Sequence, residues 1–375
     1  YKVTPRLKFS GQYIGSNSES QSYVHFYKYN PDGRSQSLSN NYNGSFKVNH
    51  AIGKRTFYEA HIFSNQTNYK SFQFAPLDFG SAIPFKSGID YGNEEDALLF
   101  IRDAGQYIIG SNTITILNDS TYILPNSNYA SSQNIQGAPS SPTFSFGGSN
   151  RGHTYRYSKS YGGKIDFTSQ VNSRHALKMG LEYRLDNLNE RLFSVLYDDN
   201  TYRIPTIGPE NASPSHSYYS ENAIFFSGYI QDKLEYESFI MNVGIRYDLF
   251  DPQSSHIDSL LNPENSLIKS SKKAMWSPRI GVAYPITDEG ILHFSYGHFY
   301  QMPTMRNLFL RNIFGAGLSP AIGYSDLKPQ KTVMYEFGMQ QQLSRYLAIN
   351  GSIFYKDIRD LLALQTINYN SLYPI

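Results

Sequence analysis

Apolar and polar residues alternate with a period of two in eight separate stretches of this chain. The apolar positions of one stretch are Met241, Val243, Ile245, Tyr247 and Leu249, and polar residues or glycine stand between them. The same division recurs at 177–185 and 292–297. Successive side chains of a β-strand point to opposite faces, so each stretch predicts a strand with one apolar and one polar face. The apolar faces carry almost no charge, as the wall of a membrane barrel requires.

The predicted strands come in pairs joined by short turns. They are 164–171 with 176–185, 224–234 with 239–249, 278–284 with 291–300, and 333–341 with 347–355. A looser pair, 42–48 with 58–62, follows a single strand at 7–15. This predicts about eleven strands, with short turns at one end and long loops at the other, which is typical of an outer-membrane barrel. The longest irregular segment, 64–155, is expected to cap or line the mouth.

A soluble β-sandwich is the alternative fold, and the polar faces of the strands argue against it. One face of a sandwich strand meets bulk water and usually carries many Lys and Glu residues. Here the polar faces hold Ser, Thr, Asn, Gln, Gly and scattered opposite charges, such as Lys164 with Asp166 and Glu182 with Arg184. Asp232 is the exception on an apolar face, and it lies near a turn, where the penalty is small. The pattern therefore favours an antiparallel transmembrane β-barrel.

Composition agrees with a membrane barrel and limits the classes of function. Of the 375 residues only 17% are charged, whereas 15% are aromatic, including 32 tyrosines and one tryptophan. Such a composition suits aromatic girdles at two membrane interfaces. No apolar run approaches the roughly 18 to 20 residues of a membrane helix. A net charge of +2 without a long basic run gives no support for nucleic-acid binding.

Catalytic and metal-binding patterns are missing from the sequence. It contains no cysteine, no nucleophile elbow and no phosphate-binding glycine loop, and its nine histidines lack metal-ligand spacing. His293 and His298 are the nearest pair, but an odd spacing puts them on opposite faces of a strand. The acidic run 94–96 and residues 198–200 could hold calcium in outer loops, or they could be solvated loop tips. We predict that the protein is no enzyme and needs no cofactor.

Two segments carry a family resemblance. Residues 277–309 are SPRIGVAYPITDEGILHFSYGHFYQMPTMRNLF, and residues 326–361 are DLKPQKTVMYEFGMQQQLSRYLAINGSIFYKDIRDL. In order and spacing these resemble the barrel of TonB-dependent outer-membrane receptors, particularly the type common in Bacteroidetes-like bacteria. Weaker likeness extends over most of the chain, including HFYKYNPDG at 25–33. Gln301 stands where much of the family has arginine.

The resemblance implies a barrel of about 22 strands around a plug domain, in the bacterial outer membrane. The implied partners are membrane lipid, the receptor's own plug domain and the TonB-ExbB-ExbD energising complex. Residues 1–375 would then be about half of the barrel wall, an internal piece of a larger protein, with the plug domain and C-terminal strands outside it. Glu336 would face the plug or confined water. The implied function is to bind a scarce nutrient at the outer loops and import it with energy supplied by TonB.

Residues near the predicted outer rim are the candidates for ligand contact, because aromatic faces bind sugars, chelates and peptides alike. These candidates are Trp276, Phe299, Tyr300, Phe309 and Phe314, with Asn307 and Arg311 as polar companions. Aromatic residues of a membrane girdle would give the same pattern.

Two other functions remain open at this point. A passive barrel could act as a pore, an adhesin or a scaffold for an envelope complex, and a plug with a TonB box upstream would exclude it. A secreted all-β carbohydrate-binding protein would be soluble without detergent. A neighbouring gene for a surface lipoprotein would favour import of glycans or peptides through a lidded pair.

Overall fold

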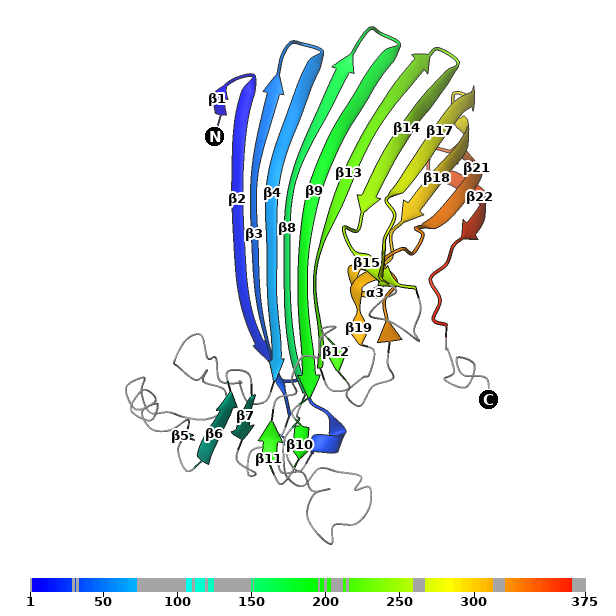
Figure 1. The fold of residues 1–375 in the computed structure, drawn as a ribbon. Coiled ribbons are helices and arrows are strands. Elements are labelled where there is room, and N and C mark those ends of the chain that lie inside the picture. Colours follow the sequence, from blue (N-terminus) through cyan, green and yellow to red (C-terminus); the bar gives the residue numbers. More distant parts are fainter. Residues whose placement is uncertain are drawn as a thin grey trace.

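A large antiparallel sheet dominates the structure (Figure 1). The computed structural model describes residues 2–28, 31, 34–72, 106–109, 112–118, 121–124, 150, 152–194, 196–198, 201–203, 212–213, 216–258, 267–312 and 321–365. The sheet has 13 strands, of which only β1 (Lys2–Thr4) and β12 (Ala212–Ser213) are very short. The long strands are β2 (Leu7–Ser20), β3 (Gln36–Ala51), β4 (Thr56–Phe72), β8 (Gly152–Gln170), β9 (His175–Ser194), β13 (His216–Tyr236), β14 (Phe239–Asp251), β17 (Lys273–Thr287), β18 (Gly290–Gln301), β21 (Gln330–Ser344) and β22 (Leu347–Arg359).

Each long strand pairs with the long strands before and after it in the sequence, so the sheet is an antiparallel meander. This confirms the predicted strand pairs, the antiparallel all-β class and the count of about eleven. Short turns join the strands at one end, called here the turn end, and longer segments leave at the opposite loop end. At the turn end Asn172 shapes the connection between β8 and β9, because its Oδ1 accepts hydrogen bonds from the amides of Arg174 and His175 at 2.8 and 3.0 Å.

The remaining elements are small and belong to the connecting segments. A five-stranded sheet joins β5 (Gln106–Ile109), β6 (Asn112–Asn118), β7 (Thr121–Leu124), β10 (Leu196–Asp198) and β11 (Thr201–Arg203). Two hairpins pair β15 (Ser255–Ile257) with β16 (Leu267–Lys269) and β19 (Arg311–Asn312) with β20 (Ala321–Ile322). The helices are η1 (His25–Tyr27) and α3 (Met305–Phe309). In the described part of the chain no helix has the length and apolar character needed to cross a membrane.

The two faces of the large sheet differ in chemistry. Backbone pairing places Val243, Ile280 and Tyr296 in one row of the apolar face. Large side chains on this face are exposed, with Leu181 at 54% and Val243 at 41%. A sandwich would bury them under a second layer, whereas strands that meet hydrocarbon leave them open. The wall is therefore that of a barrel portion, and it does not close within the described residues, since β22 pairs there with β21 alone.

Asp232 lies on the apolar face near the turn end, as predicted. Its Oδ2 is 2.6 Å from Nδ1 of His175 on the neighbouring strand β9. This partner could not be predicted from the sequence, because the two residues lie 57 positions apart. The pairing reduces the cost of a carboxylate on a face that is otherwise apolar.

The strands extend further toward the loop end than the sequence predicted. The strand predicted at 58–62 is Thr56–Phe72, and the strand predicted at 164–171 is Gly152–Gln170. In these extensions both faces carry polar side chains, and Asn189 donates a hydrogen bond to the Tyr218 hydroxyl at 3.1 Å. Alternation of apolar and polar residues ends where the strands leave the apolar band, so periodicity could not mark their true ends. The predicted irregular segment 64–155 was therefore too long at both ends.

An aromatic stack lies in this extension, beyond the apolar residues of β8 at 161–167. The His153 ring stacks on Phe193 with centroids 4.6 Å apart and planes 7° apart, and Phe72 and Tyr155 stack on the same ring. His153 is only 2% exposed. Burial lowers the pKa of its imidazole to about 3, with a further lowering by the charge of Arg191.

Candidate functional site

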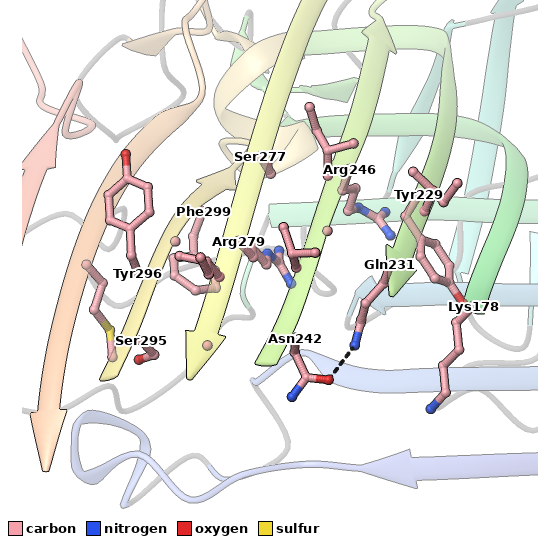
Figure 2. Close-up of a pocket in the computed structure, with 18 of the residues that line it drawn as sticks. Lys178, Tyr229, Gln231, Asn242, Arg246, Ser277, Arg279, Ser295, Tyr296 and Phe299 are labelled. Carbon is pink, nitrogen blue, oxygen red and sulfur yellow. Dashed lines mark hydrogen bonds between the residues drawn. The ribbon is translucent and has the colours of Figure 1, made fainter. Parts of the chain in front are cut away.

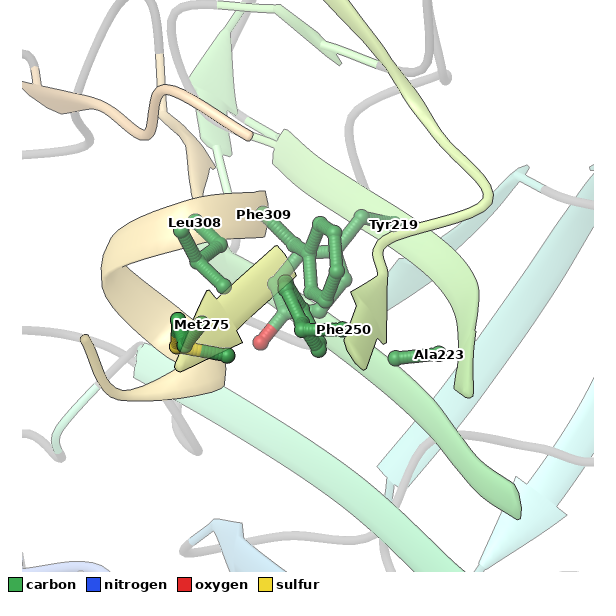
Figure 3. Packing of buried hydrophobic residues seen from close by; sticks show 6 residues of the cluster. All are labelled: Tyr219, Ala223, Phe250, Met275, Leu308 and Phe309. Carbon is green, nitrogen blue, oxygen red and sulfur yellow. The ribbon is translucent and has the colours of Figure 1, made fainter. Parts of the chain in front are cut away.

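Helix α3 packs against the polar face near the loop end of the sheet (Figure 3). The region around α3 and residues 321–327 is called the mouth below. It is only five residues long and has no side-chain hydrogen bond at its N-cap, Thr304. Helices this short are unstable in isolation, so burial must hold it in place. Leu308 and Phe309, exposed by only 1% and 2%, pack in a cluster with Tyr219, Ala223, Phe250 and Met275.

The chain that follows α3 is tied back to the helix. The Gly323 amide donates to the Leu310 carbonyl at 2.6 Å, and the Tyr324 amide donates to the Asn307 carbonyl at 3.2 Å. A Cβ on Gly323 would lie 2.7 Å from the Leu310 nitrogen, so a larger residue would push the two segments apart.

Asp326 continues this attachment to the wall. Its Oδ1 accepts hydrogen bonds from Lys273 Nζ at 2.6 Å and from the Ser271 hydroxyl at 2.7 Å. Partial burial raises the pKa of Asp326, but the hydrogen bonds from Lys273 and Ser271 outweigh it and bring the pKa to about 2. Asp326 therefore stays ionised at neutral pH and holds residues 321–327 on the mouth.

A buried carboxylate links α3 to strands β8 and β9. Glu190 Oε2 is 2.5 Å from Arg156 Nε, and Glu190 Oε1 is 3.8 Å from Arg306 Nε on α3. Glu190 is fully buried at 0% exposure. Burial raises the pKa of the neighbouring Tyr219, and the Glu190 charge raises it further, so the phenol stays neutral.

Deeper along the wall, the polar face is hollowed by a cavity of about 570 Å³ (Figure 2). Its labelled lining side chains come from β9, β13, β14, β17 and β18. The lining includes Lys164, Lys178, Arg246 and Arg279 but no carboxylate residue. Lys164 and Arg246 pair with the adjacent Asp166 and Asp248, at 3.0 and 2.7 Å.

Lys178 and Arg279 form no ion pair with any residue of the described ranges. The Arg279 guanidinium lies 4.8 Å from the centre of the Phe299 ring. Gly297 makes room for that ring, because a Cβ there would lie 3.1 Å from it. The hollow is therefore positively charged, with an aromatic side chain beneath one of its cations.

The structure separates the predicted contact residues into different places. Trp276 lies on the apolar face, 56% exposed, with its ring 4.7 Å from that of Tyr247. Phe299 lies on the polar face and lines the hollow. This places Trp276 where a girdle residue would lie.

Tyr300, Asn307 and Phe309 are brought together at the mouth. Tyr300 packs on the cluster that buries Phe309, and Asn307 lies in the same helix. In this position Phe309 shapes the mouth by packing, and ligand contact by its ring stays a prediction. Arg311 belongs to β19, whose backbone pairs with β20, and Phe314 lies outside the described residues.

Of the charged residues of the polar face, the sequence singled out Glu336 and Lys164 but neither Glu190 nor Arg156. Glu336 and Lys164 were placed there correctly, and Glu336 lies 4.0 Å from His293. Glu182 and Arg184 also lie on the polar face, as predicted, and Arg184 pairs with Asp186 at 3.1 Å. Counting alternate positions upward from Arg184 would have placed Glu190 on the polar face, but only the fold of the segment after β18 brings α3 to it.

Within the described residues no group of His, Asp and Glu side chains is arranged to hold a metal ion. The acidic run 94–96 and residues Asp199 and Asn200 lie outside the described residues. His293 and His298 point to opposite faces, as predicted: His293 approaches Glu336, and His298 accepts or donates a hydrogen bond with Tyr296 at 2.7 Å.

Comparison with known families assigns the fold. The model of the TonB-dependent receptor-like β-barrel matches residues 2–374. The chain belongs to the TonB-dependent receptor β-barrel family. This confirms the resemblance of the two sequence segments to TonB-dependent receptors, and membership of the family implies the bacterial outer membrane. No curated protein sequence matches the chain.

Solved structures resemble the chain at low sequence identity, and the first of those that follow shares its fold. The RagAB peptide transporter is 12% identical with a TM-score of 0.51, over 99% of this chain and 40% of that chain. The ferric citrate transporter FecA is 10% identical with a TM-score of 0.47, over 96% of this chain and 42% of that one. BauA, the ferric preacinetobactin receptor from Acinetobacter baumannii, is 13% identical with a TM-score of 0.44, over 85% and 37%. The chain thus spans about two fifths of the length of these proteins.

Proposed function

We propose that this chain is part of the barrel wall of an outer-membrane receptor that binds a scarce nutrient at its loop end and imports it with energy supplied by TonB. The family match over residues 2–374 carries the proposal. The division of the sheet supports it, because an apolar face suits lipid while a hollowed polar face suits a passage. The protein acts by binding and gating, without covalent chemistry.

The open edges of the sheet support further strands in the complete receptor. Among the residues that the structure describes, β22 has no partner beyond β21, and the amide and carbonyl groups of its open edge could not be satisfied by hydrocarbon. The full protein would supply the other half of a barrel of about 22 strands and a plug domain, and would cross the outer membrane many times. TonB-ExbB-ExbD would be its energising partner.

The candidate ligand contacts fall at two levels. Tyr300, Asn307 and Phe309 lie at the mouth, and Phe299 lies in the hollow below. Trp276, Arg311 and Phe314 complete the proposed set on the sequence evidence. RagAB is a peptide transporter, which supports a peptide as one candidate ligand. A surface lipoprotein lid and a Bacteroidetes-type receptor remain part of the proposal on the sequence evidence.

The test compares receptor and energy supply in the host bacterium. Strains lacking the receptor gene, lacking tonB, or lacking both are grown with single nutrients at limiting concentration. We expect one nutrient for which the receptor deletion and the tonB deletion give the same growth defect and the double deletion gives no more. A receptor defect that adds to the tonB defect would instead identify the passive barrel, a pore or an envelope scaffold.

A further inference from the structure

At the loop end of the polar face, two arginines share a single buried carboxylate. Glu190 contacts Arg156 through Nε at 2.5 Å, and its closest approach to Arg306 is also through Nε, at 3.8 Å. Glu190 itself is at 0% exposure, whereas the arginine side chains are 42% and 56% exposed. The carboxylate therefore lies behind the two guanidinium groups, which stay open to the mouth.

The charges of this group do not balance. Two arginines and one glutamate leave one positive charge, and within the described ranges no second carboxylate pairs with either arginine. Glu221 of β13 also lies on the polar face, but it makes a separate interaction and does not pair with either arginine. Since Arg156 donates to Glu190 through Nε alone, its terminal amino groups stay available. An arginine presents these donors in a planar fork that matches a carboxylate or a phosphate.

Both arginines are held in position before any ligand arrives. The Arg156 guanidinium carbon lies 5.7 Å from the centre of the Tyr69 ring. The backbone of Arg306 is held in place by the burial of its helical neighbours Leu308 and Phe309. Fixing the donors in advance reduces the side-chain entropy that binding would otherwise lose.

The position of the group suits first contact with a solute from outside. Glu190 lies five residues beyond Leu185, the last residue of the apolar run of β9. At about 3.3 Å per residue, the carboxylate is roughly 17 Å further along the strand toward the loop end. The positively charged hollow with Lys178 and Arg279 lies deeper on the same face.

We propose that Arg156 and Arg306 form a subsite for a carboxylate or phosphate group of the incoming ligand, with Glu190 as the positioning residue. This inference rests on the proposed function and narrows the ligand to an anionic solute. Neither the two arginines nor Glu190 was singled out in the sequence, and the family match does not specify the chemical class of the ligand.

The test uses a reporter cysteine, because the chain has none of its own. In the complete receptor, freed of any cysteine elsewhere, Ser158→Cys places a thiol on the polar face two positions from Arg156. The matched control is Asn65→Cys on β4, an exposed position of the same face whose partners in register are Asn43 and Ser160. Each thiol is labelled with the anionic reagent MTSES and the cationic reagent MTSET, and the rates are compared.

We expect the ratio of MTSES to MTSET rates to be about tenfold higher at position 158 than at position 65, at the lower end of the range over which focused fields change association rates. Arg156→Gln and Arg306→Gln should each lower the ratio, and together they should bring it to the control value. Citrate or inorganic phosphate should slow MTSES labelling at position 158, relative to chloride at equal ionic strength. Equal ratios at the two positions, or no protection by either anion, would overturn the subsite.

Glu190→Gln separates positioning from charge. Removing the negative charge should raise the MTSES to MTSET ratio, while loss of the fixed geometry should weaken protection by citrate. A merely structural role would lower both. The growth test of TonB dependence is independent of this labelling, so the subsite can stand if TonB coupling fails, and the reverse.

Discussion

Leu308→Ala tests how far burial of side chains holds α3 in place at the mouth. Leu308 is 1% exposed and packs with Phe309, Tyr219, Phe250 and Met275. Because the helix is five residues long and lacks a side-chain cap, it has little stability of its own. Truncating this one side chain should therefore release the helix while leaving the eleven long strands paired.

The size of the effect follows from the burial. Replacing a fully buried leucine by alanine costs about 2–5 kcal/mol, depending on how far the site can collapse. A factor of ten corresponds to about 1.4 kcal/mol, so the population of released helix should rise roughly 30-fold to 4000-fold. Opening of this segment breaks the hydrogen bonds from the Leu310 amide to Arg306 and from the Gly323 amide to Leu310.

Hydrogen exchange measured by mass spectrometry on the complete receptor reports this opening. Amides of residues 305–312 and 321–327 should exchange faster by that factor, and peptides from 177–185 in the wall should be unchanged. Leu364→Ala is the matched control, since Leu364 is 96% exposed. Unchanged exchange at 305–312 would refute the reasoning, as would equal acceleration in the wall.

Three further outcomes follow from the contacts. His153 stays neutral when buried, so its contribution to the free energy of unfolding is complete above the unfolded pKa of 6.5. That free energy should fall by about 1.4 kcal/mol per pH unit as the pH drops toward about 3. In urea unfolding of the receptor, His153→Phe should flatten this pH dependence, and an unchanged slope would contradict the argument. His175→Ala should lower stability by no more than about 1 kcal/mol, because the unpaired Asp232 lies near the turn end of the apolar face, and the double change with Asp232→Leu should recover most of it. Gly323→Ala should cost about 1–3 kcal/mol of local stability, since its Cβ meets the Leu310 nitrogen at 2.7 Å; exchange at the Tyr324 amide measures it, and native protection would contradict it.

The wall could be predicted from the sequence because each strand carries its own signal within the apolar band. In β14 the run Met241 to Leu249 fixes which side faces lipid without reference to any other strand. Beyond that band the Asn187 side-chain amide donates a hydrogen bond to Asn222 on the neighbouring strand at 2.7 Å. Polar side chains of this kind are compatible with either face of a strand, so the sequence there shows no alternation. Strand ends at the loop side therefore depend on pairing with neighbours, which a single sequence does not display.

The mouth could be predicted only in part, because its residues meet through long-range packing. The segment around Asn307 and Phe309 was identified as important from its aromatic content and its place after a strand. The surface on which this segment packs could not be predicted, since Leu308 and Phe309 are buried against Tyr219 and Phe250, which are far from them in sequence. In the sequence Arg306 is one cation among many, and only the packing of α3 brings it within 3.8 Å of Glu190.

Glu190 and Asp232 show how position decides what a carboxylate costs. Each is paired with a cation, and each has one oxygen without a hydrogen-bond partner, Oε1 of Glu190 and Oδ1 of Asp232. Asp232 lies near the turn end, where lipid-facing charge costs little. Glu190 is fully buried, and replacing a buried ion pair by apolar residues is often neutral or stabilising by about 1–4 kcal/mol. Stability alone therefore does not account for Glu190, whereas the orientation of two partly exposed arginines at the mouth does.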